Sequence, residues 1–244
     1  MQALLKLTYT EFKLFLREPA AVFFTLAFPV LVVLLFGSIF GGYPVPGTPM
    51  KTIDLYTPAY TGLVIGTVGL IGLPSTLALY RERGILRRLR ATPLGSTRIL
   101  AAHVLVNLAM TLFGIALLVA TAALFLDLRM PHAPGVVLIA VTISSLSFFA
   151  VGFALASLLP SVRVAQAVGQ ALFFPMFFLS GAALPLQQMP SWLQLVSDYV
   201  PLTYAVRLVQ EVWVGEGWNW SAATVLVVIL ALATLLTTRV FRWE

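Results

Sequence analysis

Side chains that carry acid–base or metal chemistry are few in this 244-residue chain, which has nine acidic residues, two histidines and no cysteine. A buried catalytic site needs acids, bases or metal ligands that face one cavity. All nine acids instead fall in expected loops, at the ends of apolar stretches or in a short segment near the end of the chain: Glu11, Glu18, Asp54, Glu82, Asp127, Asp198, Glu211, Glu216 and Glu244. His103 falls near the start of the third long apolar stretch and His132 in the loop that follows it, so the two cannot share a metal ion. We therefore predict no catalytic residues and no metal site.

Nucleotide chemistry lacks its residues as well. A phosphate-binding P-loop needs the pattern G-x-x-x-x-G-K-[ST], in which the lysine reaches the phosphates. The three lysines, Lys6, Lys13 and Lys51, do not stand in that pattern. The serines of residues 144–147 lack a neighbouring base and are of the kind that bonds to the preceding helical turn. We therefore expect no cofactor in this chain.

Composition and hydropathy indicate a membrane protein. Hydrophobic residues make up 60% of the chain and charged residues 10%, with a mean hydropathy of +0.98, whereas soluble domains carry about 25% charged residues. Six apolar stretches reach the roughly 20 residues that a helix needs to cross a bilayer. The predicted fold is therefore an all-α integral membrane protein with six transmembrane helices, at about Ala20–Gly41, Leu55–Tyr80, Ile99–Leu126, Gly135–Leu159, Ala165–Leu184 and Ala222–Thr238.

Basic residues assign the sides of the membrane. Twelve of the 15 lysines and arginines fall on the side that holds both chain ends, and Lys51, Arg129 and Arg207 fall on the other. Basic loops favour the cytoplasm. We therefore predict a multi-pass protein with both termini cytoplasmic. The pI near 10.0 is then a sign of topology, and nucleic acid is not an expected partner.

Two segments outside the spans are predicted to lie at the membrane surface. Residues 1–18 place a basic stripe beside an apolar, aromatic face, which is typical of an amphipathic interfacial helix next to anionic membrane lipids. Residues 185–217 hold two short helical pieces, about Ser191–Tyr199 and Leu202–Val214. Four of the five tryptophans lie in or just after this segment, namely Trp192, Trp213, Trp218 and Trp220. Because tryptophan concentrates at headgroup level, we predict a re-entrant extracellular helical hairpin. The chain is expected to form a single transmembrane domain, 1–244.

The densest run of charge, residues 81–93, lies between the second and third spans. Ile85, Leu86 and Leu89 share one helical face, and the Arg83, Arg87 and Arg90 side chains share another. This pattern predicts a short amphipathic helix held between two spans. Glu82 has no basic partner three or four residues ahead, so another group is expected to pair with it. The alternative is a loop that follows the charge rule and contacts lipid headgroups.

The run Tyr80–Pro93, continuing into Leu94-Gly95-Ser96, resembles the cytoplasmic coupling helix of ABC type-2 membrane proteins, the permeases of the type V exporter fold. The segment Phe174–Gly181 resembles the fifth span of that family. Residues 184–204, with their two short helices, resemble its extracellular segment. The resemblance covers essentially the whole chain, and the compact loops are most similar to the drug-resistance and nodulation-factor exporters.

The resemblance implies the permease subunit of an ATP-binding-cassette exporter for hydrophobic or amphipathic cargo, a drug, lipid or lipid-linked glycan, in the cytoplasmic (inner) membrane of a prokaryote. Its partners would be separate ATPase subunits, which bind ATP and Mg, and a second copy of itself or a paralogous permease. The residues implied to couple to the ATPase are Glu82, Arg83, Ile85, Leu86, Arg87, Leu89 and Arg90. Those implied to line the substrate pathway, from spans two and five, are Thr61, Val64, Ile65, Phe173, Phe174, Phe177 and Phe178.

Two other functions fit a chain of this composition. A membrane-embedded enzyme is disfavoured by the placement of its acids and histidines. A non-transporting membrane assembly subunit remains the second alternative.

Overall fold

The structure is a computed structural model that describes residues 9, 12, 13, 15, 17, 19–45, 49–85, 96–183, 186 and 189–240. Most of the predicted interfacial helix, residues 1–18, lies outside the described residues. So do residues 86–93 of the predicted amphipathic helix, and Leu184 and Pro185 at the start of the predicted hairpin.

The described residues are nearly all helical, with one isolated bridge between Pro44 and Lys51. Six helical stretches are long and apolar enough to cross a membrane, which confirms the predicted number of spans. The first consists of η1 (Phe23–Ala27) and α3 (Phe28–Phe40), and α2 (Pro19–Val22) precedes it. The second consists of α4 (Thr52–Gly66), η2 (Thr67–Gly72) and α5 (Leu73–Glu82). The third lies within α7 (Ser96–Phe125), and the other three are α8 (Pro134–Leu158), α9 (Val162–Leu179) and α12 (Trp220–Val240). Between the last two lie α10 (Ser191–Ser197) and α11 (Pro201–Val214), close to the two short helices expected there.

The fifth span is the one whose end differs most from the prediction. It was expected to continue to Leu184, but α9 ends at Leu179. The cause is Gly181, whose φ of 84° lies in the left-handed region that favours glycine and turns the chain out of the helix.

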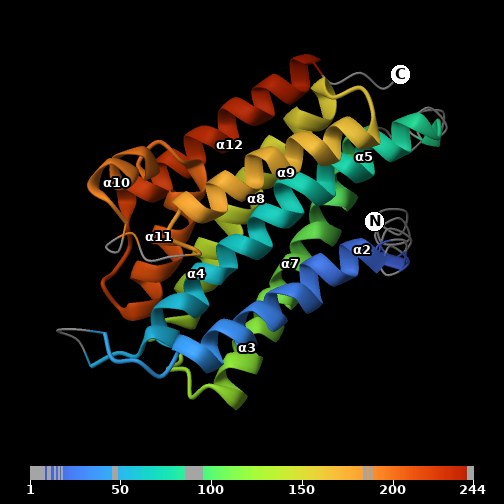
Figure 1. Ribbon diagram of the computed structural model, residues 1–244. Helices are drawn as coiled ribbons and strands as arrows, with labels where there is room; N and C mark the ends of the chain where they lie inside the picture. The colour runs from blue at the N-terminus through green and yellow to red at the C-terminus, as the bar shows by residue number, and fades with distance from the viewer. Residues whose placement is uncertain are drawn as a thin grey trace.

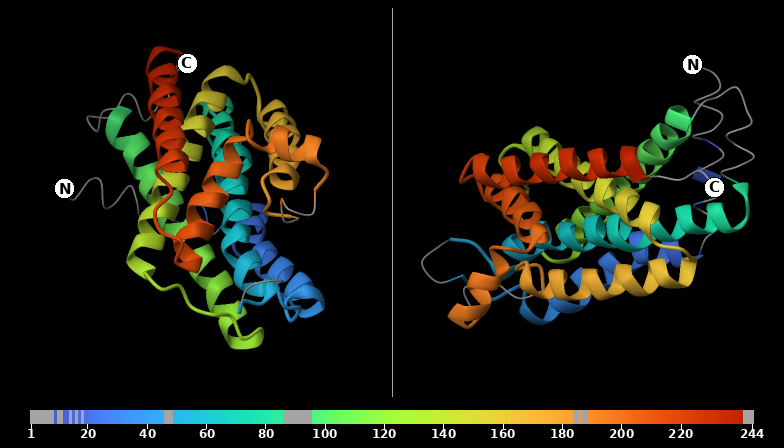
Figure 2. Two further views of the ribbon diagram at one scale, coloured as in Figure 1. Left: turned by 90° about the vertical axis from the view of Figure 1, so that its left-hand side faces the viewer. Right: turned by 90° about the horizontal axis from the view of Figure 1, so that it is seen from above.

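The second span is the central helix of the bundle. It contacts α3, α7, α8, α9 and α11. In its 18-residue apolar stretch, 72% of the residues are buried, against 22% in the corresponding stretch of the first span and 17% in that of the fifth. Figure 2 shows it running between α12 on one side and α9 on the other. In Figure 1, α10 and α11 lie together at one end of the bundle, here called the hairpin end. The last residues of α5 and α12 lie at the opposite end, here called the Arg81 end.

Two prolines explain the two π-helical segments. Pro29 and Pro74 lack an N–H and crowd the carbonyl four residues earlier. Each π-helical segment ends two residues before its proline, η1 before Pro29 and η2 before Pro74. In η2 the Leu73 N–H donates to Val68 O, and Pro74 has none to donate, so Gly69 O has neither its α-type nor its π-type donor. Wide turns of this kind redirect a helix axis.

Glycines of the second span fit it against three different helices. A Cβ on Gly62 would lie 2.7 Å from Val206 of α11, one on Gly66 would lie 2.6 Å from Phe173 of α9, and one on Gly69 would lie 2.8 Å from Phe148 of α8. Small residues allow such close approach between membrane helices. The glycine face of span two is therefore a packing surface in this conformation.

Candidate functional site: the two ends of the second span

At the Arg81 end, the second span is bonded to the connection between spans four and five. The Arg81 guanidinium donates through Nη1 to Ala156 O at 3.1 Å and through Nη2 to Leu159 O. Sequence reasoning treated Arg81 only as one of the basic residues of that side. A signal was present in Pro160, which has no N–H and therefore leaves Ala156 O without its helical donor.

Glu82 has its partner in the same connection. Its Oε1 accepts a hydrogen bond from the Val162 N–H at 2.9 Å, at the first residue of α9. The side chain of Arg83 is exposed and that of Ile85 is partly buried. The other predicted coupling residues, Leu86, Arg87, Leu89 and Arg90, lie outside the described residues, so the contact with an ATPase stays a prediction for the whole set.

The predicted pathway residues divide into a buried and an exposed group. Four are enclosed within the bundle: Thr61, Val64 and Ile65, each 0% exposed, and Phe173, which packs on Gly66. Phe177 is partly buried and stacks on Phe173, with ring centroids 5.6 Å apart. Phe174 and Phe178 are 50% and 55% exposed on α9. A route along the first group therefore requires α4 to separate from helices that pack on it, whereas the second group already faces outward.

At the hairpin end, a buried carboxylate starts the second span. Asp54 is 2% exposed and accepts the Lys51 N–H and the Arg129 N–H, both at 2.9 Å. As the third residue of α4, Asp54 accepts the N–H of the N-cap residue Lys51, which is the contact made in a capping box. The Trp213 indole then donates to Arg129 O at 3.2 Å, and Gln210 donates to Leu55 O at 3.0 Å. One residue, Arg129, thus joins the start of α4 to α11 through its backbone.

An ion pair between Lys51 and Asp127 lies on the exposed rim of this end. Lys51 Nζ lies 2.5 Å from Asp127 Oδ2, and the hydrogen bond from Lys51, followed by its charge, lowers the pKa of the Asp127 carboxyl. A lowered folded-state pKa adds stability above the unfolded-state pKa and loses it as pH falls through the folded value. Because Asp127 is fully exposed, solvent screens the pair, and we expect stability to change little at neutral pH when it is removed.

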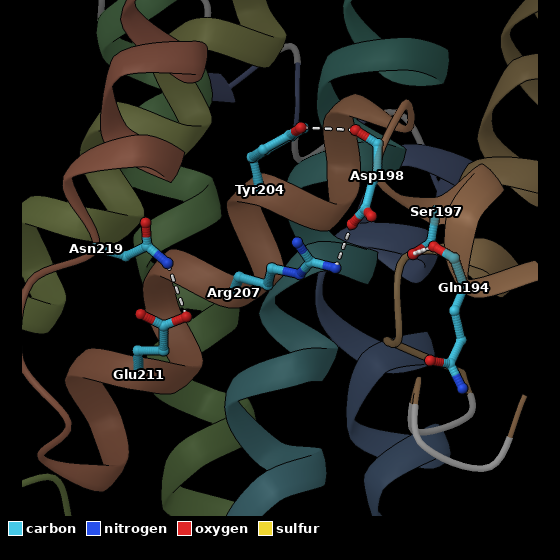
Figure 3. Close-up of polar contacts among 7 residues, drawn as sticks. All are labelled: Gln194, Ser197, Asp198, Tyr204, Arg207, Glu211 and Asn219. Atoms are coloured by element: carbon cyan, nitrogen blue, oxygen red, sulfur yellow. Dashed lines mark hydrogen bonds and ion pairs between the residues drawn. The ribbon is translucent and has the colours of Figure 1, made fainter. Parts of the chain in front are cut away.

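Polar contacts also define the shape of the hairpin (Figure 3). Arg207 and Glu211 are four residues apart, yet each has a partner elsewhere: Arg207 donates to Asp198 Oδ1 and Asn219 donates to Glu211 Oε1, both at 2.7 Å. The Tyr204 hydroxyl donates to Asp198 O at 2.6 Å. Asp198 thereby joins the end of α10 to α11. The location of this hairpin in the membrane stays a prediction.

The tryptophans in and just after the hairpin do not share one environment. Trp192 and Trp220 are exposed, as a position at headgroup level requires, but Trp213 is 4% exposed and belongs to the core. The reason is the apolar face of α11, which packs on α4 and carries Trp213 with it.

No group of three or more metal-ligating side chains occurs among the residues that the structure describes. His103, on α7, is buried against the ring of Tyr80, on α5, at the Arg81 end, whereas the His132 ring lies beside Gly215 at the hairpin end. The polar side chains discussed above thus bond to helix ends and turns and do not form a catalytic or metal site.

The family model for the ABC-2 type transporter matches residues 2–214. This chain belongs to the ABC-2 type transporter family. The permease is 28% identical over 213 residues to transport permease ycf38 of Cyanophora paradoxa, a match covering 85% of this chain and 72% of that protein. It is 29% identical over 221 residues to the ycf38 permease of Pyropia yezoensis, covering 86% and 73%. Nodulation protein J of Rhizobium leguminosarum bv. viciae is 29% identical over 76 residues, or 31% of this chain and 29% of that protein.

These matches confirm the resemblance stated from the sequence and place the chain among multi-pass transport permeases, not enzymes. Permeases of this family work with ATPase subunits.

Proposed function

We propose that this permease is the membrane subunit of an ATP-binding-cassette exporter that moves hydrophobic or amphipathic cargo, a drug, lipid or lipid-linked glycan, across the cytoplasmic membrane of a prokaryote. A separate ATPase that binds ATP and Mg powers it from the Arg81 end, which we assign to the cytoplasm. A second copy of the chain, or a paralogous permease, completes the complex.

The observation that supports this proposal most strongly is the position of the second span. It is the most buried of the six, and its last helix, α5, leads directly into the basic amphipathic run of residues 83–93. A force applied to that run acts on the helix that contacts α3, α7, α8, α9 and α11. An ATPase docked there would therefore act on five neighbouring helices through one connection.

The exposed aromatic face of α9 supports the choice of cargo. Phe174 and Phe178 offer apolar contact area outside the protomer core, and aromatic side chains bury large apolar surfaces on contact. In the conformation described, Thr61, Val64 and Ile65 are enclosed within the bundle. We propose that they join the pathway when ATP binding moves α9 away from α4.

Reversing two charges of the basic run is expected to detach the motor. The variant Arg87→Glu with Arg90→Glu should lower the amount of vanadate-sensitive ATPase that co-purifies with the permease by about tenfold or more, because like charges across an interface cost several kcal/mol. The control, Arg163→Glu with Arg239→Glu, makes the same change in net charge at the same end of the bundle. Equal co-purification of both variants with the parent would refute docking at residues 83–93. ATP hydrolysis without movement of any cargo would favour the assembly subunit.

A further inference from the structure

Two adjacent residues of opposite charge bind opposite ends of two consecutive helices. Arg81 donates to Ala156 O and Leu159 O, at the C-terminal end of α8. Glu82 accepts from Val162 N, at the N-terminal end of α9. The C-terminal end of a helix favours a cation, and the N-terminal end favours an anion. The order Arg–Glu therefore matches the order of the two helix ends, and we call these contacts the α8–α9 clamp.

Local sequence makes both helix ends require a partner. Pro160 offers no N–H to Ala156 O, and the Leu159 N–H is used by Leu155 O, so Arg81 supplies the donors for the last carbonyls of α8. Ser161 caps α9 by accepting the Val164 N–H at 3.3 Å, which leaves the Val162 N–H for Glu82. Charge-assisted hydrogen bonds of this kind are shorter and stronger than neutral ones. The clamp is thus specific in geometry and differs from a general attraction between basic side chains and lipid.

Helix packing also joins the second span to α8 and α9 at a distance from the clamp. α5 contacts both α8 and α9 along its length. Leu70 O, which lies four residues before Pro74, is approached so closely by Gly169 of α9 that a Cβ there would collide with it. Gly152 of α8 fits against Gly69 O in the same way. The second span, α8 and α9 therefore meet at two levels, through backbone contacts at η2 and through charges at the Arg81 end.

We infer that the α8–α9 clamp makes the end of α5, the end of α8 and the start of α9 move as one body, so that motion of the segment after Glu82 passes directly to the fifth span. Arg81 and Glu82 are positioning residues in this scheme. Glu82 acts through α9 and not through the surface of the ATPase. The inference rests on the proposed docking of the motor at residues 83–93.

The first test uses the permease alone. The chain has no cysteine, so Thr76→Cys on α5 and Arg163→Cys on α9 can carry spin labels without further changes. Pulsed electron paramagnetic resonance should give a narrow distance distribution between the labels in the parent. Arg81→Ala with Glu82→Ala should at least double its width, and Arg239→Ala, an exposed arginine at the same end, should leave it unchanged. An unaltered width in the double variant would overturn the clamp, whatever the ATPase does.

The second test uses the complex with the ATPase in lipid nanodiscs. Labels at Leu105→Cys on α7 and Arg163→Cys should show a distance change on trapping with ATP and vanadate. In the double variant, this change should disappear while the ATPase still co-purifies and hydrolyses ATP at a rate within twofold of the parent. The single variant Glu82→Gln keeps one carbonyl acceptor for the Val162 N–H and should therefore retain part of the distance change. A nucleotide-driven change that survives in the double variant, or none in the parent, would refute transmission to α9.

The two tests separate this inference from the proposed function. Failure of the parent to bind an ATPase contradicts the docking proposal, and the first test still decides whether the clamp exists. If the double alanine variant does not fold, as shown by loss of a monodisperse peak in detergent, Arg81→Lys and Glu82→Gln replace it. Lysine cannot reproduce the fork that reaches two carbonyls, so the width should still increase.

Discussion

Replacing Asp54 by alanine is expected to lower the stability of the folded permease by about 2–4 kcal/mol, because two charge-assisted, partly buried hydrogen bonds to backbone N–H groups are lost. Both bonds are 2.9 Å long, and the side chain is 2% exposed. Thermal unfolding in detergent, followed by the loss of the monodisperse peak, should show a midpoint lower by roughly 5–10 °C.

A matched control for Asp54 lies on the same end of the molecule. Asp127 is also an aspartate with a lysine partner, but its side chain is 88% exposed. Asp127→Ala should change the midpoint by no more than about 2 °C, since exposed ion pairs contribute little. Asp54→Asn keeps one acceptor oxygen and should fall between the two. Equal effects of Asp54→Ala and Asp127→Ala would contradict a stabilising role for the buried carboxylate.

The loss should also be visible in the hairpin. Arg129 connects Asp54 to Trp213 through its two backbone groups, N–H to the carboxylate and carbonyl to the indole. Without Asp54, Arg129 loses one of these two backbone contacts, and the Trp213 environment should become more polar. A red shift of tryptophan emission in Asp54→Ala, absent when Trp213 is replaced by phenylalanine, would report this.

Replacing Gly152 by alanine is expected to destabilise the permease by about 1–3 kcal/mol, the usual range for overpacking. The added Cβ would collide with Gly69 O, a backbone atom that no rotamer change can move. That carbonyl is also the one left without a helical donor by η2 and Pro74. Its present neighbour is the Gly152 backbone, and weak Cα–H···O contacts of this kind recur at helix interfaces. Separating α8 from the second span would expose the carbonyl to a medium without water.

Gly135 provides the comparison on the same helix. It lies in the first turn of α8, and a Cβ there would meet nothing within 4 Å. Alanine is a better helix former than glycine by about 1 kcal/mol at most, so Gly135→Ala should be neutral or slightly stabilising. The two substitutions thus have opposite expected signs in one thermal-unfolding assay. A neutral Gly152→Ala would show that α8 and η2 are not held at this distance in the protein.

Much of the architecture could be predicted from residue type alone. Long apolar stretches, few charges and the one-sided placement of arginine predict six spans, because the bilayer imposes a minimum length and a charge preference on every crossing helix. Pro201 and the apolar spacing after it likewise located α11. The run Tyr80–Pro93 pointed to the family that residues 2–214 then confirmed. These features depend on local composition, which a sequence displays directly.

The tertiary structure alone decided which faces of those helices meet. Lipid-facing and buried side chains are both apolar in a membrane protein, so Thr61 and Ile65 carry no mark in the sequence that separates them from Phe174 and Phe178. Arg81 and Glu82 find their partners 75 to 80 residues away, on backbone atoms that any residue possesses. Asp54 likewise bonds to backbone N–H groups. The sequence determines that this chain crosses the membrane six times, and only the packing of the helices determines what the charged residues at their ends hold together.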